Sequence, residues 1–358
     1  FTIKNAESYN NIIMKRNKSL KLVICLMAAA MLLVLLNSCG IVRIEPGSTG
    51  QSACKTAEKK DKYRIYMVDS FIGYFYCNDV FRGAVEAADE LGDVELIRVG
   101  PYSINTDKQI EAFNDAIADG ADAIFVTALA PDRWIEPINK AVESGIPVVC
   151  YDCDAPDSER IAYYGTMNYK AGYMAGLGMT ERLGRDGKVA IMLGSKEAQN
   201  NIERITGFED ALKNESNLEV VCIEPTNNLL TVAIEKAQKI FDEHPDITGI
   251  FASSGSDAQA VVRVMKNSGI DTDTVTIIGF DDDAKTLELI KSGDVFGTIV
   301  QNTHDMGYES VMHLYRILKG ELPDEKAENG SDVIDTGIAF VTKDNVESYK
   351  NEWEYLKE

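Results

Sequence analysis

From residue 62 onward, short apolar runs rich in β-branched residues alternate with amphipathic helical patterns, and this alternation restricts the possible fold more than any other feature. Residues 63–68 predict a strand, residues 79–91 a helix and residues 94–99 a second strand. The same order continues to a last strand around residues 337–341. Strands that alternate with helices indicate parallel βαβ units and therefore an α/β fold.

The alternation runs through the chain twice, and 358 residues are too many for one ordinary core. We therefore expect two similar doubly wound, Rossmann-like lobes. Elements continue beyond the second lobe, which indicates that the chain crosses back and that several strands form a hinge. The expected N-terminal lobe comprises residues 62–166 plus 302–330, and the C-terminal lobe comprises residues 167–301 plus 331–345.

Two helix starts carry specific capping predictions. Thr106 followed by Gln109 has the spacing of a capping box. Asn168 is expected to be the N-cap of a helix that begins at Tyr169.

The amino-terminal segment has the pattern of an export signal. A basic region precedes an apolar run of 15 residues, 22–36, which is short for a membrane-spanning helix. The following Leu-Asn-Ser-Cys resembles the lipobox of bacterial lipoproteins and implies lipidation of Cys39; a plain signal peptide is the alternative. Met14 has the place of a start residue. We expect a signal peptide at 14–38 and a lipidated flexible tether at 39–61.

Bulk charge and the cysteines exclude several classes of function. A net charge of −21 disfavours nucleic acid as a partner, because its phosphates would be repelled. Cys150 and Cys153 have C-x-x-C spacing, but they end a strand and there is no second cysteine pair. We interpret Cys150 as an apolar strand residue and expect no metal and no cofactor.

Polar and aromatic side chains recur where predicted strands end, which places them at the carboxyl edges where open α/β sheets bind ligands. Carboxylates, amides and a guanidinium can bind sugar hydroxyl groups, and aromatic rings can cover the C–H faces of a sugar. Arg204 lies near the start of its helix, so an acidic or hydroxyl partner outside that helix is expected. The strand-end groups are residues 70–76, Asp152, Ser253, Ser254, residues 281–283, Gln301 and Asn302.

Residues 64–341 resemble the type I periplasmic binding proteins, the ribose-binding-protein-like receptors of sugar ABC transporters. The resemblance rests on motifs in the family's order: residues 81–92, Gly145-Ile-Pro-Val-Val149 with Asp152, Gly165-Thr-Met-Asn168, Glu203-Arg-Ile-Thr-Gly-Phe208, Ile277-Ile-Gly-Phe-Asp281 and Gly297-Thr-Ile-Val-Gln301.

The resemblance implies ligand-binding roles for individual residues. It implies that Asp152, Arg204, Asp281 and Gln301 bind sugar hydroxyl groups. It places the aromatic pair of the family near Phe75 and Tyr76, with a possible shift toward Tyr74.

Three positions depart from the ribose-binding pattern. Cys153 replaces an arginine, Ser254 replaces an asparagine, and Asn228 occupies the place of a pocket aromatic. We therefore expect the ligand to be a monosaccharide-type sugar other than ribose.

Rival classes lack their characteristic sequences. There is no G-x-G-x-x-G after the first strand and no P-loop, so we expect no enzyme. A sugar-responsive repressor would carry a helix-turn-helix where this chain has an export signal. The expected protein is a monomeric receptor, lipid-anchored outside the bacterial cell membrane, that delivers sugar to an ABC transporter permease. The alternative is a receptor that presents its closed form to a membrane sensor kinase.

Overall fold

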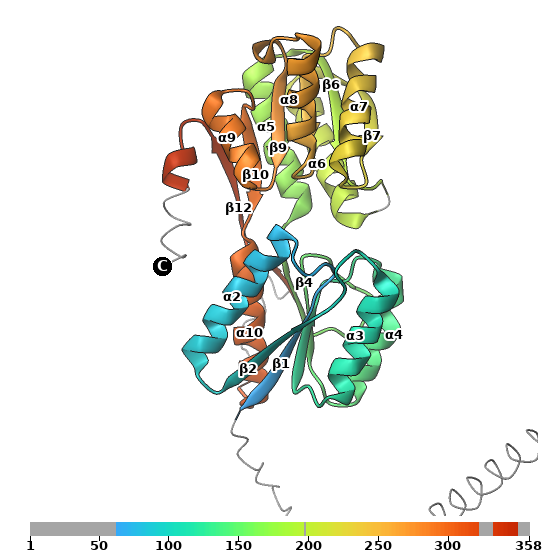
Figure 1. Cartoon of the computed structure of the whole chain (residues 1–358), viewed down its shortest axis with the longest axis vertical. Coiled ribbons are helices and arrows are strands. Elements are labelled where there is room, and N and C mark those ends of the chain that lie inside the picture. Colours follow the sequence, from blue (N-terminus) through green and yellow to red (C-terminus); the bar gives the residue numbers. More distant parts are fainter. Residues whose placement is uncertain (1–61, 197, 322–331, 350–358) are drawn as a thin grey trace, which may run out of the picture. The chain divides into compact units, whose positions relative to one another are not determined.

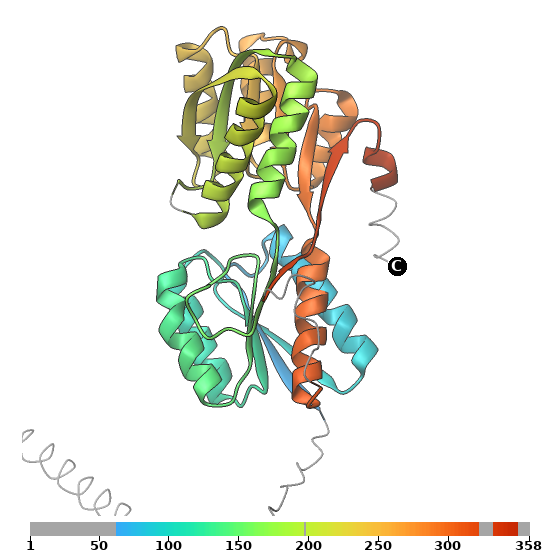
Figure 2. The ribbon, with the colours of Figure 1, turned by 180° about the vertical axis from the view of Figure 1, so that it is seen from behind.

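The structure is a computed structural model that describes residues 62–196, 198–321 and 332–349. These residues form two lobes, each an open sheet with helices on both faces (Figures 1 and 2). The predicted pair of α/β lobes joined by several connections is confirmed. The predicted signal peptide, the tether and Cys39 lie outside the described residues.

The first lobe is built on a parallel six-stranded sheet. Alternate residues of one central strand enter opposite cores, as the strand repeat requires: Ile65 and Met67 face one, Tyr66 and Val68 the other. Trp134 is fully buried in the core that Tyr66 and Val68 face. In spatial order the strands are β11 (Val333–Asp335), β5 (Ala162–Gly165), β4 (Val148–Tyr151), β3 (Ala123–Val126), β1 (Tyr63–Val68) and β2 (Val94–Val99). Helices α2 (Phe75–Leu91) and α10 (Thr303–Leu318) cover one face, and α3 (Thr106–Ala118) and α4 (Pro131–Glu143) the other.

The second lobe repeats this plan with one antiparallel edge strand. Its order is β12 (Ile338–Thr342), β10 (Gly297–Gln301), β9 (Thr276–Phe280), β8 (Gly249–Ala252), β6 (Asp186–Leu193) and β7 (Asn217–Pro225), with β12 antiparallel to β10. Helices α7 (Leu230–Glu243), α8 (Asp257–Ser268) and α9 (Ala284–Ser292) cover one face, and α5 (Asn168–Leu183) and α6 (Gln199–Glu215) the other.

The described chain passes between the lobes at three places, from β5 to α5, from β10 to α10 and from β11 to β12 (Figure 2). Hydrogen bonds tie these connections together. The Thr336 amide donates to the Gly165 carbonyl oxygen at 3.0 Å, and the Asn302 amide donates to the Gly337 carbonyl oxygen at 3.3 Å. The connections therefore form one linked strip.

The third connection includes a strand that the sequence did not reveal. We expected residues 331–345 in the C-terminal lobe, but β11 pairs with β5 in the first sheet and only β12 joins the second. A strand of three residues is too short to show a repeat of apolar side chains.

The predicted capping box is wrong. Asn105, not Thr106, is the N-cap of α3, and its side chain accepts a hydrogen bond from the Lys108 amide at 3.0 Å. Gln109 points inward and donates to the Thr127 carbonyl oxygen at 2.9 Å. The side chain that the pattern assigned to the helix start therefore secures the end of β3.

Within these described ranges, no helix combines the length and the apolar character needed to cross a bilayer.

Candidate functional site

Two aspartates occupy equivalent places in the two lobes. Asp152 directly follows β4 and Asp281 directly follows β9, and these strands hold the same position in their sheets. Both residues have a left-handed backbone, with φ of 59° and 70°. This conformation is uncommon outside glycine and concentrates at functional sites. The duplicated fold thus presents one carboxylate from each lobe.

Asp152 is held by side chains from other elements of its lobe. The Tyr76 hydroxyl, on α2, donates to its Oδ1 at 2.8 Å, and the Thr127 hydroxyl donates to its Oδ2 at 3.2 Å. Burial raises the pKa of Asp152, while the Tyr76 hydrogen bond and the Arg204 charge oppose that rise. Burial likewise raises the pKa of Tyr76 well above its usual range, so this phenol stays a donor.

Arg204 joins α6 to the strip of connections. Its Nε donates to Asn168 Oδ1 at 2.8 Å, and its Nη2 donates to Gln301 Oε1 at 3.3 Å. The guanidinium carbon lies 3.8 Å from the centre of the Phe280 ring. The partners outside the helix are amide oxygens and an aromatic face, not the acid or hydroxyl that we expected.

Arg204 reaches this place because two helices approach each other closely. A Cβ atom at Gly172 of α5 would lie 1.9 Å from the Arg204 carbonyl oxygen. Only glycine fits there, so the Ala171-Gly172 pair lets α6 carry the arginine to the connections.

Gln301, at the end of β10, contacts residues of both lobes. Its Nε2 donates to Asp281 Oδ1 at 2.8 Å, and its Oε1 accepts from the Thr166 hydroxyl at 2.8 Å. The Tyr76 oxygen lies 3.4 Å from the same Oε1. One buried amide therefore links both lobes to a connection.

Asp281 is the second carboxylate of this network and, like Asp152, is partly buried. Burial is the largest cause that raises its pKa to about 6. The Arg204 charge and the Gln301 hydrogen bond oppose that rise, whereas the charges of Asp282 and Asp152 add to it. The arginine thus lies in the field of both site aspartates.

Two aromatic rings at the start of α2 remain partly exposed. Tyr74 and Phe75 are 37% and 39% exposed, and their ring centres are 4.8 Å apart. A Cβ atom at Gly255 would lie 3.6 Å from Phe75 Cζ and 3.5 Å from Asp281 Oδ2. Phe75 therefore lies near Asp281, although the two residues belong to different lobes.

The predicted helix start after β1 was too late, and the error affects these rings. We expected the helix to begin near Asp79, but α2 begins at Phe75. The helix, rather than a loop, therefore positions Phe75 and Tyr76.

The structure does not bring every predicted residue into the network. Asn228 is exposed in the turn before α7, with φ of 55°, and its amide packs against Gly194. Ser254 lies at the end of β8, and its hydroxyl is buried without a partner among the described residues. Ligand contact by either residue stays a prediction.

Three polar residues of the network were missed as site residues: Thr166, which donates to Gln301, Asn168 and Thr127. Asn168 does not cap α5, since the helix begins at that residue and Met167 is the N-cap. Its side chain instead accepts from Arg204 and donates to the Thr166 carbonyl oxygen at 3.0 Å. Thr127, which contacts Asp152, directly follows β3, so the strand-end rule could have found it.

The C-x-x-C pair has no bond between its thiols. Cys150 is fully buried in β4, and both Cys150 and Cys153 are free. Burial raises the pKa of Cys153 well above its usual range, which disfavours the reactive thiolate. Among the residues described, no group of histidine, cysteine, aspartate and glutamate could hold a metal ion.

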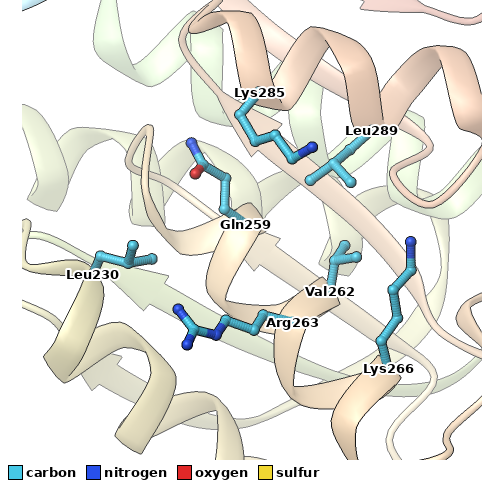
Figure 3. Close-up of a pocket in the computed structure, with 7 residues that line it drawn as sticks. All are labelled: Leu230, Gln259, Val262, Arg263, Lys266, Lys285 and Leu289. Carbon is cyan, nitrogen blue, oxygen red and sulfur yellow. The ribbon is translucent and has the colours of Figure 1, made fainter.

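One pocket, of about 340 Å³, lies between α7, α8 and α9 and contains none of the predicted site residues (Figure 3). Lys266 and Lys285, on its rim, pair with Asp294 and Glu288. The pocket is lined by Leu230, Gln259, Val262, Arg263, Lys266, Lys285 and Leu289.

The two parallel-stranded lobes, their three connections and the polar network at those connections define a two-lobed solute-binding protein. A family model described as periplasmic binding protein domain matches residues 65–322, and the chain belongs to this family. Proteins of this family bind substrates and are not enzymes, as the sequence predicted.

Relatives with known names support this assignment. The chain is 24% identical over 296 residues to the xylose/arabinose-binding protein XylF of Sulfolobus acidocaldarius, covering 78% of this chain and 72% of that protein. It is 33% identical to GanP, a glucose-galactose binding protein from Geobacillus stearothermophilus, with a TM-score of 0.74, covering 80% of this chain and 99% of that structure. It is also 33% identical to a chain of the XylFII-LytSN complex, with a TM-score of 0.70, covering 79% of this chain and 98% of that structure.

Proposed function

We propose that this chain is an extracytoplasmic lipoprotein that binds a monosaccharide-type sugar between its lobes and delivers it to an ABC transporter. One observation carries the proposal: Asp152, Arg204, Asp281 and Gln301, from separate elements of both lobes, form with Tyr76 a single hydrogen-bonded network. The names of the relatives, which bind xylose, arabinose, glucose or galactose, support a sugar as ligand.

The chemistry of the network suits sugar hydroxyl groups. A hydroxyl group both donates and accepts, so it can bind a carboxylate and a guanidinium or amide at once. Tyr74 and Phe75 expose ring area near Asp281, where they could cover a C–H face of the ligand. Ser254 and Asn228 complete the set that we propose to contact the sugar.

The proposed mechanism is closure of the lobes about the three connections. Sugar that contacts Asp152 in one lobe and Asp281 in the other binds more tightly when both lobes reach it. This difference in affinity shifts the population toward the closed form. Thr166, Asn168 and Gln301 lie at or beside the connections, so ligand contact and hinge geometry share residues.

A screen of mono- and disaccharides by thermal unfolding should identify the ligand, because a sugar at a hundred times its Kd adds about 2.7 kcal/mol to the free energy of unfolding. Small-angle scattering should then show a smaller radius of gyration with that sugar than without it. A disaccharide that does not shift the unfolding temperature serves as the control. An unchanged radius at saturation, or conversion of the sugar into a product, would contradict the receptor mechanism.

An alternative partner is a membrane sensor kinase that reads the closed form. The solved XylFII-LytSN complex shows that one structural relative assembles with a second protein. The contacts to the sugar would be the same for a transporter receptor and a sensor receptor, so the membrane partner must be identified directly. Co-purification of the lipid-anchored protein in the presence of the identified sugar would separate a permease from a sensor.

Lipidation is tested at Cys39. Cells that express the wild-type protein should incorporate a labelled fatty acid into it, and the Cys39→Ala variant should not. Cys54→Ala is the matched control, because it removes a cysteine of the predicted tether and should keep the label. Label that persists in Cys39→Ala would show that the anchor lies elsewhere or is absent.

A further inference from the structure

A group of buried polar atoms at the start of α8 has no hydrogen-bond partner among the described residues. It comprises the hydroxyl oxygens of Ser253, Ser254 and Ser256 and both carboxylate oxygens of Asp257. The Asp257 side chain is fully buried, with 0% of the residue exposed. Buried polar groups in folded proteins are almost always bonded to protein or to ordered water. This concentration of unpaired atoms therefore requires an explanation.

The group borders the proposed sugar site. The Ser253 carbonyl oxygen accepts from Arg204 Nη1 at 3.4 Å. The Asp257 amide donates to the Ser254 carbonyl oxygen at 3.0 Å, which closes a tight turn around Gly255. A Cβ atom at Gly255 would contact both Asp281 and Phe75. The turn that carries the unpaired atoms thus lies against residues of the network.

Neighbouring polar groups use their hydrogen bonds elsewhere. The Thr226 hydroxyl donates to the Leu193 carbonyl oxygen at 3.1 Å. Asp283 Oδ1 accepts from Gln259 Nε2 at 2.7 Å and from two amides at the start of α9. Thr226 uses its proton on Leu193, and the single proton of the neighbouring Ser254 hydroxyl cannot satisfy both carboxylate oxygens of Asp257. Ordered water or ligand therefore supplies the remaining partner.

We infer that Ser254, Ser256 and Asp257 form an inner wall of the sugar site and bind one sugar hydroxyl group through ordered water held by the Asp257 carboxyl. The inference rests on the proposed function and extends it to a residue outside the expected set. Serine at position 254 has a shorter side chain than the asparagine that the family resemblance implied. The shorter side chain leaves space for water between the sugar and Asp257.

The charges around Asp257 give this water site a dependence on pH. Burial, with the charge of Asp281, raises the pKa of Asp257 to about 7, although the neighbouring Ser254 and Thr226 hydroxyl groups oppose the rise. The other charged groups around the turn are Arg204 on α6, Asp283 before α9 and Lys285. Lys285 forms an ion pair with Glu288. Sugar in the site excludes bulk water and so further disfavours the charged form of the Asp257 carboxyl. Sugar binding is therefore coupled to the uptake of a proton by the protein near neutral pH.

Calorimetry with the tightest of D-xylose, L-arabinose, D-ribose, D-glucose and D-galactose tests the inference, at pH 6 to 8 and in buffers of different ionisation enthalpy. The wild-type protein should lose affinity as the pH rises and should take up protons at pH 7. Asp257→Asn should bind about 10-fold more weakly at pH 6, because its amide holds the water differently, and should lack that part of the proton uptake. Asp152 and Asp281 are present in both proteins, so the difference between the two profiles reports on Asp257 and on its coupling to Asp281.

Asp271→Asn is the matched control, because it makes the same change at an exposed aspartate of the same lobe and should leave the wild-type profile unchanged. Ser254→Asn is a second test variant that should displace the water and flatten the pH profile. Equal affinity and equal proton uptake in the wild type, Asp257→Asn and Ser254→Asn would overturn the inference and leave the proposed function intact. Failure of every sugar to bind the wild type would overturn both.

Discussion

Replacing Arg204 by methionine should weaken sugar binding by about 100-fold or more while the protein stays folded. A hydrogen bond to a charged group contributes about 1.5–3 kcal/mol, and 2.7 kcal/mol corresponds to about 100-fold in Kd. Methionine keeps an apolar stem against Phe280 but leaves Asn168 Oδ1 without its donor. It also removes the cation that lowers the pKa of Asp281, so this carboxyl should titrate at higher pH in the variant.

Arg182 supplies the matched control for this experiment. It also lies over a phenylalanine ring in the same lobe, with its guanidinium carbon 5.7 Å from the centre of the Phe296 ring, but it is exposed in the last turn of α5. Calorimetry should therefore show wild-type affinity for Arg182→Met. Arg204→Lys should recover only part of the affinity, because an ammonium lacks the planar fork that reaches Asn168 and Gln301 together. Wild-type affinity in Arg204→Met would remove this arginine from the proposed site.

The Asp257→Asn variant should be more stable than the wild type above neutral pH. The pKa of Asp257 is raised from 3.8 to about 7 in the folded protein, so folding favours the protonated form. That contribution is fully present below the unfolded pKa and is lost as the pH rises through the folded pKa. At 1.36 kcal/mol per pKa unit, the wild type loses about 4 kcal/mol between pH 4 and pH 8 from this group. Asparagine is neutral throughout and does not incur this loss.

Urea unfolding at pH 5 and pH 8 measures the difference in stability between Asp257→Asn and the wild type. The free energy of unfolding of Asp257→Asn minus that of the wild type should grow with pH and level off above pH 7. Asp281, whose pKa is raised to about 6, is present in both proteins, so the comparison reports on Asp257 and on its coupling to Asp281. The Asp271→Asn control should show no such growth. A difference that is constant with pH would contradict protonation of Asp257 in the folded protein.

Local sequence patterns predicted the structure correctly where a feature depends on a single helix or strand. Strands β1 and β2 begin and end at the residues that the apolar spacing predicted. The strand-end rule predicted Asp152, Asp281 and Gln301 as residues at one edge, because the carboxyl end of a parallel strand is fixed by its own boundary. Patterns failed for Gln109 and Asn168, whose capping spacing was correct but whose side chains found partners in distant strands and helices.

The sequence by itself determined the two α/β lobes, since the alternation of strands and helices is a local and repeated property. It also determined which polar groups end the strands. Only the tertiary structure decided that β11 joins the first sheet and that close helix contact at Gly172 brings Arg204 to the connections. It also decided that Asp257 is buried beside the network with carboxylate oxygens that no other described residue satisfies. These features depend on contacts between residues far apart in the chain, and burial, nearby charges and hydrogen bonds together shift the pKa of a carboxyl group.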